Sequence, residues 1–430
     1  MMRMRLFPIR LLHGWRAIAL ALTAAVLLPS APAEAVKTLR LRDKPTVADS
    51  TKKNPLAFYL ARGEANACGR GCSEWIAVEG SFDSGAADRL RSLLKRNPAA
   101  AKFPVIFHSP GGEVMNAFAI GRIMRQRGMT ASVGLTVPEV CAGGESDACR
   151  EAKSSGKPVA ARLFTVRGSC ASACVWAVAG AKVREILPGA LLGVHSYRQE
   201  ISVTVRAGSL VSDERIRAYA RERYRAYQQS ARAAADNRTR SYLVEMGISP
   251  EVFALAATVP HDKIHFLTRE EIIRFGFDAS ESRETRWTVV ATQAAQKYAV
   301  KYFLEGKAAG NSQVQTSFLR AYCSLKNTVR IDYVRGQTGE ARPSPGWVEL
   351  AFDGRQVTMV KSSWGTNQDI QTSIAPFALI DQVAGAGQLS ITQVFEKPDA
   401  KNDRRTLSLA NDGLAEAIEA LRPTCGGQAT

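Results

Sequence analysis

The chain has 430 residues, of which 46% are hydrophobic and 23% charged, and its formal net charge is +17. This composition excludes a disordered or fibrous protein, and the length is sufficient for two domains. The positive charge is spread over both halves and is accompanied by no recognition motif. It therefore favours weak attraction to anionic envelope surfaces over binding to nucleic acid.

The first 35 residues differ from the rest of the chain. Four arginines precede an apolar run from Ala17 to Pro29, and Ala33-Glu-Ala35 fits the small-residue pattern of a cleavage site. This predicts a cleavable secretory signal peptide over residues 1–35, whose removal lowers the formal charge to +14. The apolar run is about 13 residues long, short of the roughly 20 that span a bilayer, although an uncleaved anchor remains an alternative.

The cysteines all follow the predicted cleavage site. An even number of cysteines in an exported chain predicts up to four disulfides and a location in an oxidising bacterial periplasm. Their spacing leaves the pairing open, except that the last two are expected to close the C-terminal part. No Cys-x2-Cys pair recurs and histidines are few, so neither a metal nor a cofactor is expected. The eight positions are Cys68, Cys72, Cys141, Cys149, Cys170, Cys174, Cys323 and Cys425.

The chain order of the expected elements indicates an α/β core. Residues 36–66 are predicted to form an irregular N-terminal arm, and residues 134–158 a disulfide-tied insertion. Strands and helices alternate over residues 67–284, which favours a mostly parallel sheet. The expected strands cover 75–80, 103–108, 162–166 and a segment ending at 195; the expected helices begin near 84, 113, 173, 211, 250 and 268.

The helix predicted over residues 211–246 is rich in arginine. Its basic face has two interpretations: a docking surface for an anionic partner, or a face that simply meets water. Charged helix faces are most often solvated, so the second interpretation is preferred.

The pattern changes after about residue 285. Segments 327–334, 347–352 and 356–361 alternate like strands, with a tight turn at Asp353-Gly354, and a last helix carries Leu414 and Leu421 on one face. We expect a small, disulfide-closed α+β domain over residues 285–430.

Three short motifs supply the parts of a serine acyl-transfer site. They are Ser109-Pro-Gly-Gly112, Cys170-Ala-Ser-Ala-Cys174 and Gly193-Val-His195. A serine hydroxyl needs a base to take its proton, and the oxyanion that forms needs preorganised donors. Ser172 opens an apolar helix and is the expected nucleophile, while the N–H groups of Gly111, Gly112 and Ala173 are the expected oxyanion donors. His195 ends the next strand and has a pKa suited to a general base.

The order of these motifs resembles the Clp protease proteolytic subunit and the wider Clp/crotonase-like fold. The resemblance covers roughly residues 74–280 and leaves the C-terminal third outside. It implies Ser172 as nucleophile, His195 as general base 23 positions later, and the Gly-Gly turn as one side of the oxyanion hole. The organisation looks like that of exported, Clp-like envelope proteins, which implies a peptidase without an ATPase partner.

The third member of a triad departs from the family pattern. Strict alignment of Asp262-Lys-Ile-His-Phe-Leu-Thr268 puts Ile264 at the acid position, so Asp262, the candidate acid, is displaced by two residues. A Ser-His dyad and a degenerate site are the alternatives. His108 competes as base and Ser169 competes with Ser172 for a role in capping the helix.

Cys170 and Cys174 flank the expected nucleophile. They are interpreted as structural disulfide cysteines, with a redox gate, or Cys170 as nucleophile, as the alternatives. The sequence thus predicts a periplasmic serine hydrolase that acts on a peptide or other acyl substrate, with a homo-oligomer left open. The rival interpretations are an inactive Clp-like scaffold or binding protein, an acyl-CoA enzyme, which export disfavours, and a Ser-Lys dyad enzyme.

Overall fold

The computed structural model has a mixed α/β fold with several separate sheets. Met1–Asp43 with Ile201–Tyr227 form one compact unit, and Lys44–Glu200 with Gln228–Thr430 form the other. The predicted signal peptide, residues 1–35, lies outside the described residues. The residues that the structure describes are 36–42, 54–69, 71–198, 202–208, 211–278, 283–291, 296–306, 314–324, 327–336, 345–362, 370–395 and 403–425.

The first unit holds a pair of strands and the beginning of a long helix. Strands β1 (Val36–Arg42) and β11 (Ser202–Gly208) run antiparallel. Helix α6 (Asp213–Glu245) begins in this unit and continues into the second one. The irregular arm predicted for residues 36–66 is wrong where the structure describes it, because both β1 and β2 (Ala57–Arg62) are strands. Their partners come from distant parts of the chain, which a local pattern does not reveal.

A seven-stranded sheet forms the centre of the second unit, in the order β6-β7-β2-β3-β4-β5-β9. Four of its strand pairs are parallel: β7 with β2, β3 with β4, β4 with β5, and β5 with β9. Buried apolar runs such as that of β4 suit a strand that is covered on both faces. Apart from β2, the strands are β3 (Glu74–Glu79), β4 (Val105–His108), β5 (Thr130–Val133), β6 (Leu135–Pro138), β7 (Val159–Phe164) and β9 (Val183–Glu185).

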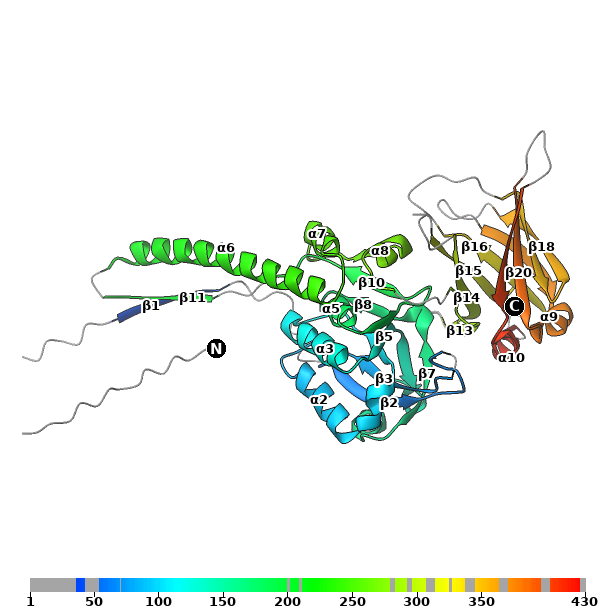
Figure 1. The fold of residues 1–430 in the computed structure, drawn as a ribbon, viewed down its shortest axis with the longest axis horizontal. Helices are drawn as coiled ribbons and strands as arrows, with labels where there is room; N and C mark the ends of the chain where they lie inside the picture. Colours follow the sequence, from blue (N-terminus) through cyan, green and yellow to red (C-terminus); the bar gives the residue numbers. More distant parts are fainter. Residues whose placement is uncertain are drawn as a thin grey trace, which may run out of the picture. The chain divides into compact units, whose positions relative to one another are not determined.

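Helices pack around this sheet and share a large hydrophobic core with it. Helix α2 buries Ala87, Leu90 and Leu94 on one face, and α3 packs against both α2 and α5 (Figure 1). The helix expected near residue 268 is α8, and it begins with a capping box in which Thr268 and Glu271 are bonded reciprocally. The helices are α2 (Ala86–Arg96), α3 (Val114–Gln126), α4 (Asp147–Ser154), α5 (Ala173–Ala179), α7 (Glu251–Thr258) and α8 (Arg269–Arg274), with 3-10 turns at Pro98–Lys102, Glu139–Cys141 and Thr165–Arg167.

A small three-stranded sheet carries the motifs of interest. Its order is β12-β10-β8, and the strands are β8 (Ser169–Ala171), β10 (Leu191–Val194) and β12 (His265–Phe266). Strands β8 and β10 are parallel, and β12 runs antiparallel to β10. The carboxyl ends of β8 and β10 therefore lie next to each other.

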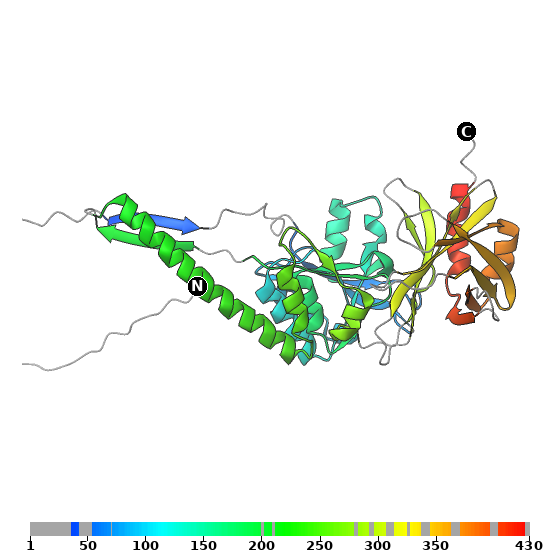
Figure 2. The same ribbon diagram turned by 90° about the horizontal axis from the view of Figure 1, so that it is seen from above.

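The C-terminal part forms a nine-stranded sheet with its own hydrophobic core. Helices α9 (Phe377–Ala384) and α10 (Leu414–Cys425) pack against this sheet and each other (Figures 1 and 2). The sheet has more strands than the sequence predicted. Only β16, β17 and β18 show clear alternation in sequence, so the other strands were not recognised. Its strands are β13 (Thr288–Ala291), β14 (Lys297–Glu305), β15 (Gln315–Cys323), β16 (Thr328–Val334), β17 (Trp347–Phe352), β18 (Arg355–Ser362), β19 (Ile370–Pro376), β20 (Gln388–Phe395) and β21 (Asp403–Ala410).

All eight cysteines form disulfides, as the even count predicts. The pairs are Cys68–Cys72, Cys141–Cys149, Cys170–Cys174 and Cys323–Cys425. The second pair ties the 134–158 segment and the last closes the C-terminal part, both as expected. Over the described residues, no helix combines the length and the apolar character that a membrane crossing requires.

Candidate active site

Ser172 stands at the junction between β8 and α5 in an unusual backbone conformation. Its φ is +55° and its ψ is −123°, a region that residues other than glycine rarely occupy. Such conformations cost about 1–3 kcal/mol and persist only where the surrounding structure enforces them. The Ser172 side chain makes no hydrogen bond that caps α5. The half-buried hydroxyl is therefore not committed to a helix-capping role.

The backbone on both sides of Ser172 is held in place by several bonds. The Ser172 N–H donates to the Gly193 carbonyl oxygen at 2.8 Å, and the Ala171 N–H donates to the Ser109 carbonyl oxygen at 2.9 Å. The Cys170–Cys174 disulfide links the residues two positions before and two after Ser172, with 5.3 Å between their Cα atoms. Both half-cystines are fully buried, so this clamp belongs to the core.

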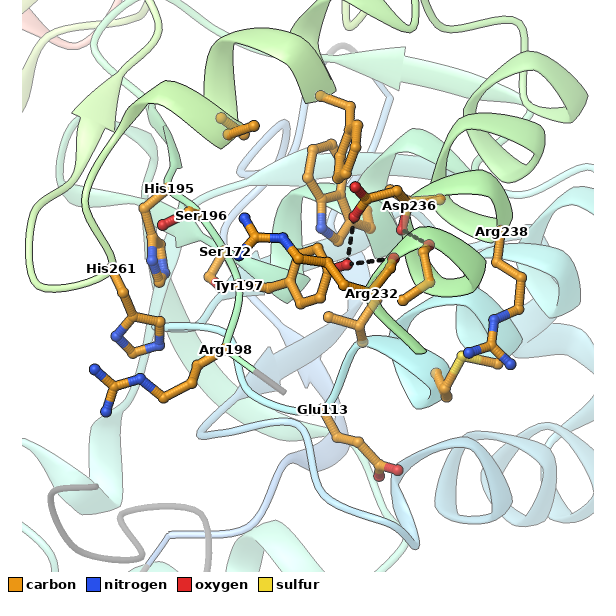
Figure 3. Close-up of a pocket in the computed structure, with 18 of the residues that line it drawn as sticks. Glu113, Ser172, His195, Ser196, Tyr197, Arg198, Arg232, Asp236, Arg238 and His261 are labelled. Atoms are coloured by element: carbon orange, nitrogen blue, oxygen red, sulfur yellow. Dashed lines mark hydrogen bonds between the residues drawn. The ribbon is translucent and has the colours of Figure 1, made fainter. Parts of the chain in front are cut away.

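His195 lies immediately after the carboxyl end of β10, as Ser172 does after β8. Because Ala171 is opposite Gly193 in these parallel strands, Ser172 and His195 follow at one edge of the small sheet. Both side chains line one cavity of about 540 Å³ (Figure 3). The structure thus brings the predicted nucleophile and the predicted base to the same cavity.

The His195 imidazole has an unsatisfied polar atom. Its Nδ1 is buried and has no hydrogen-bond partner among the described residues. The ring of His261 meets it edge-on, with 5.0 Å between the ring centroids. Burial, and then the neighbouring His261, lower the pKa of His195 below its ordinary value of 6.5, with the Ser196 backbone acting in the opposite direction. This direction favours the neutral ring, which is the form that accepts a proton.

The two glycines of the turn have different roles. The Gly111 N–H donates to Ser109 Oγ at 3.2 Å, so it is already engaged, and its φ is +105°. A Cβ on Gly111 would lie 2.6 Å from the Ser172 Cβ and 3.0 Å from the Ala173 nitrogen, which explains why only glycine fits there. Gly112 lines the cavity, and no partner for its N–H occurs within the described part of the chain. Of the three predicted donors, Gly112 thus keeps an unengaged N–H at the cavity, whereas the Gly111 N–H is engaged and Ala173 is fully buried.

The structure does not bring Asp262 to His195. Asp262 is exposed in the turn after α7, and it is absent from the lining of the cavity. Strands β10 and β12 pair with Val194 opposite His265, so the continuing register puts Ile264 opposite His195. This is the residue that the alignment puts at the acid position. No carboxylate from the described residues bonds to the His195 Nδ1.

The competing residues identified from sequence lie elsewhere. His108 does not line the cavity; its Nδ1 accepts the Ser169 N–H at 3.3 Å, and burial, opposed by Glu79, lowers its pKa. Ser169 lies within β8, three residues before the junction, and does not line the cavity. His108 is thus not positioned as a base at this cavity, and Ser169 does not cap α5, whose N-cap residue is Ser172.

Other residues of the cavity were not singled out from the sequence. The Tyr197 hydroxyl donates to the Asp236 carboxylate and also contacts the Arg232 carbonyl oxygen at 3.2 Å (Figure 3). Proximity in sequence to His195 and Asp262 was the only available signal for Tyr197 and His261. The remaining lining combines apolar and basic side chains: Val114, Met115, Trp176, Phe253, Ala256, Ala257, Arg198, Arg232 and Arg238, among others.

The described residues contain no group of three or more His, Cys, Asp or Glu side chains arranged to hold a metal ion. Because every cysteine is in a disulfide, none is available as a thiolate ligand or nucleophile in this oxidised state.

No protein-family model matches the chain, and no curated protein matches it. One similar solved structure is the invasion associated protein b from Bartonella henselae, with 11% identity, a TM-score of 0.25, and 32% of this chain aligned to 92% of that one. Another is a mutant of the 1510-N membrane-bound stomatin-specific protease, with 14% identity, a TM-score of 0.26, and 47% of this chain aligned to 75% of that one. Likenesses of this size carry no functional information.

Proposed function

We propose that this protein is a periplasmic serine hydrolase, an ATP-independent peptidase with a Clp/crotonase-like core. Ser172 is the nucleophile and His195 the general base that takes its proton and returns it to the leaving group. The Gly112 and Ala173 N–H groups stabilise the oxyanion. The proposed domains are the Clp-like core over 67–284 and the C-terminal α+β domain over 285–430, after a signal peptide over 1–35.

One observation carries this proposal. Ser172 adopts a strained, left-handed conformation at a strand-to-helix junction, without a capping bond, at the same edge and cavity as a neutral histidine. Strain of this kind is maintained by the surrounding fold and concentrates at functional sites. A serine that merely began a helix would have an extended backbone and a side chain bonded to the helix N–H groups. The four disulfides support an oxidising compartment such as the periplasm.

A second candidate function is a catalytically inactive, Clp-like scaffold or binding protein. It is favoured by the His195 Nδ1, which is buried without a carboxylate partner, and by Ile264 at the acid position. A base that no acid orients is a weaker catalyst, although a Ser-His dyad retains the essential proton transfer.

Labelling by a fluorophosphonate probe separates the two functions. We expect the wild-type protein to be labelled, and Ser172→Ala and His195→Ala to lose labelling by roughly 10³-fold or more, because these residues act as a unit. Asp262→Ala is expected to stay within about threefold of wild type, since the side chain is exposed and away from the cavity.

Ser169→Ala is the matched control, because it removes a hydroxyl three residues before Ser172, in strand β8 and outside the cavity. It should label like the wild type. A folded wild-type protein that the probe does not label would establish the scaffold over the hydrolase. A loss in Asp262→Ala as large as that in His195→Ala would show that the acid reaches the base in solution.

A further inference from the structure

We propose that the cavity beside Ser172 binds an acidic peptide segment, with Arg198, Arg232 and Arg238 receiving its carboxylates. The catalytic use of this site rests on the proposed hydrolase function, whereas the binding does not. The sequence favoured a merely solvated basic face for α6 as a whole. Two arginines of this helix, Arg232 and Arg238, differ from the others because they line the cavity.

The three arginines come from two separate elements and line one cavity. Arg232 and Arg238 belong to α6, and Arg198 follows β10 by four residues. All three side chains are exposed. None takes part in an ion pair with another described residue, although α6 does form such a pair elsewhere, between its Glu245 and Arg122 of α3. Three exposed arginines without an ion pair among the described residues thus line one cavity.

The two carboxylates of the cavity are already engaged. Asp236 receives the hydroxyl of Tyr197, and Glu113 accepts a hydrogen bond from Asn116 Nδ2 at 2.8 Å. A guanidinium recognises a carboxylate through two parallel N–H donors, which gives both affinity and orientation.

The distribution of charge favours a chain over a single small anion. Arg198 and Arg238 are drawn on opposite sides of the cavity, with Arg232 between them and Ser172 on the Arg198 side (Figure 3). Trp176, Phe253, Val114 and Met115 provide apolar surface in the same cavity. An extended peptide satisfies both features, since its backbone and aliphatic stems cover apolar surface while its Asp or Glu carboxylates reach separate arginines. A cavity of about 540 Å³ accommodates a few such residues.

Calorimetric titration of the full mature chain carrying Ser172→Ala tests the proposal, because this variant cannot turn the ligand over. The ligands are three end-blocked peptides of equal length that differ only in having Glu, Gln or Lys at alternate positions. We expect the Glu peptide to bind at least about tenfold more tightly than the Gln peptide, with the difference shrinking as salt is raised. The Lys peptide should bind most weakly.

Charge reversal identifies the residues responsible. Arg232→Glu and Arg198→Glu, placed separately in the Ser172→Ala background, should each weaken binding of the Glu peptide by about tenfold or more. Arg96→Glu makes the same change of charge at the end of α2, outside the cavity, and should leave binding unchanged. Circular dichroism shows whether each variant is folded. Because the two substitutions lie on different elements, the test still stands if one of the variants misfolds.

Several results would overturn the inference. Equal binding of the Glu and Gln peptides would do so, as would a preference that both reversals leave intact. Binding to vesicles of anionic phospholipid, without binding to the Glu peptide, would assign the arginines to a membrane surface instead. Failure of fluorophosphonate labelling with intact peptide binding would reject the hydrolase and retain the acidic-peptide site, so the two proposals fail separately.

Discussion

The nine-stranded sheet and the cavity beside Ser172 both bury polar side chains, but they do so in different ways. In the sheet, Asp332 is fully buried, and its carboxylate accepts hydrogen bonds from Arg320, Arg330 and Thr372. Burial alone would raise the pKa of Asp332, but these bonds outweigh it and lower the pKa below its ordinary value. Beside the cavity, the His195 Nδ1 is buried with no partner among the described residues.

This difference distinguishes a structural polar group from one available for chemistry. A buried carboxylate with several donors stabilises one arrangement of the strands around it. An unpartnered imidazole nitrogen contributes no such bond and leaves the ring free to exchange a proton. The backbone at Ser172, by contrast, is firmly held: a disulfide and hydrogen bonds to neighbouring strands maintain its positive φ.

The largest expected effect is on stability and falls on the sheet. Asp332→Ala should lower the free energy of unfolding by about 2–3 kcal/mol, less than for a fully buried pair because Arg320 and Arg330 are partly exposed. His195→Ala should change it by less than about 1 kcal/mol, because the Nδ1 atom has no bond to lose. Urea unfolding followed by circular dichroism measures both values.

Asp381→Ala is the matched control for this measurement. It removes a carboxylate from the exposed pair with Arg422, and should cost no more than about 0.5 kcal/mol. If His195→Ala destabilised the protein as much as Asp332→Ala, His195 would be a structural residue like Asp332, and the proposed contrast between the two would be wrong.

The second effect concerns the clamp around Ser172. We expect the double variant Cys170→Ala/Cys174→Ala to lose at least about tenfold in the rate of fluorophosphonate labelling, because Ser172 can then relax from its left-handed conformation. Cys68→Ala/Cys72→Ala removes a disulfide of the same sequence separation of 4. Each loss should cost about 2 kcal/mol of stability by loop entropy. Cys170→Ala/Cys174→Ala should cost more than that because both half-cystines are fully buried, so the labelling rate is the readout that tests the clamp. Equal labelling rates in the two variants would show that the Cys170–Cys174 disulfide stabilises the core without controlling the conformation of Ser172.

The smallest expected effect is on the pH dependence of labelling. His195 must be neutral to accept the Ser172 proton, and its pKa lies below 6.5, so labelling should fall on acidification with a midpoint below pH 6.5. His261→Asn removes a neighbour that disfavours the protonated ring. The midpoint should therefore rise towards 6.5 without reaching it, since burial remains the main cause.

His265→Asn serves as the control for this shift, because His265 bonds to Glu271 and does not line the cavity. Its midpoint should match that of the wild type. A downward shift in His261→Asn would contradict the assigned electrostatics.

The sequence by itself determined the features that depend on near neighbours. The capping box at Thr268, the apolar face of α2 and the short strands on either side of Ser172 all follow from local pattern. The sequence also indicated that the motifs Ser109-Pro-Gly-Gly112 and Cys170-Ala-Ser-Ala-Cys174 belong to one site, because the first supplies expected oxyanion donors and the second the expected nucleophile. The alignment of Asp262-Lys-Ile-His-Phe-Leu-Thr268 also showed that Asp262 is displaced from the acid position, and the pairing of β12 with β10 agrees, because it continues with Ile264 opposite His195.

Only the tertiary structure decided which partners those residues have. The pairing of β1 with β11, and most strands of the nine-stranded sheet, depend on contacts between distant segments that no local period encodes. In the same way, His261 reaches His195, and α6 supplies Arg232 and Arg238 to the cavity, through packing of elements far apart in the chain. The conformation of Ser172 depends on both, because a local disulfide and the hydrogen bond from its N–H to the Gly193 carbonyl oxygen together hold the serine where its own preferences would not.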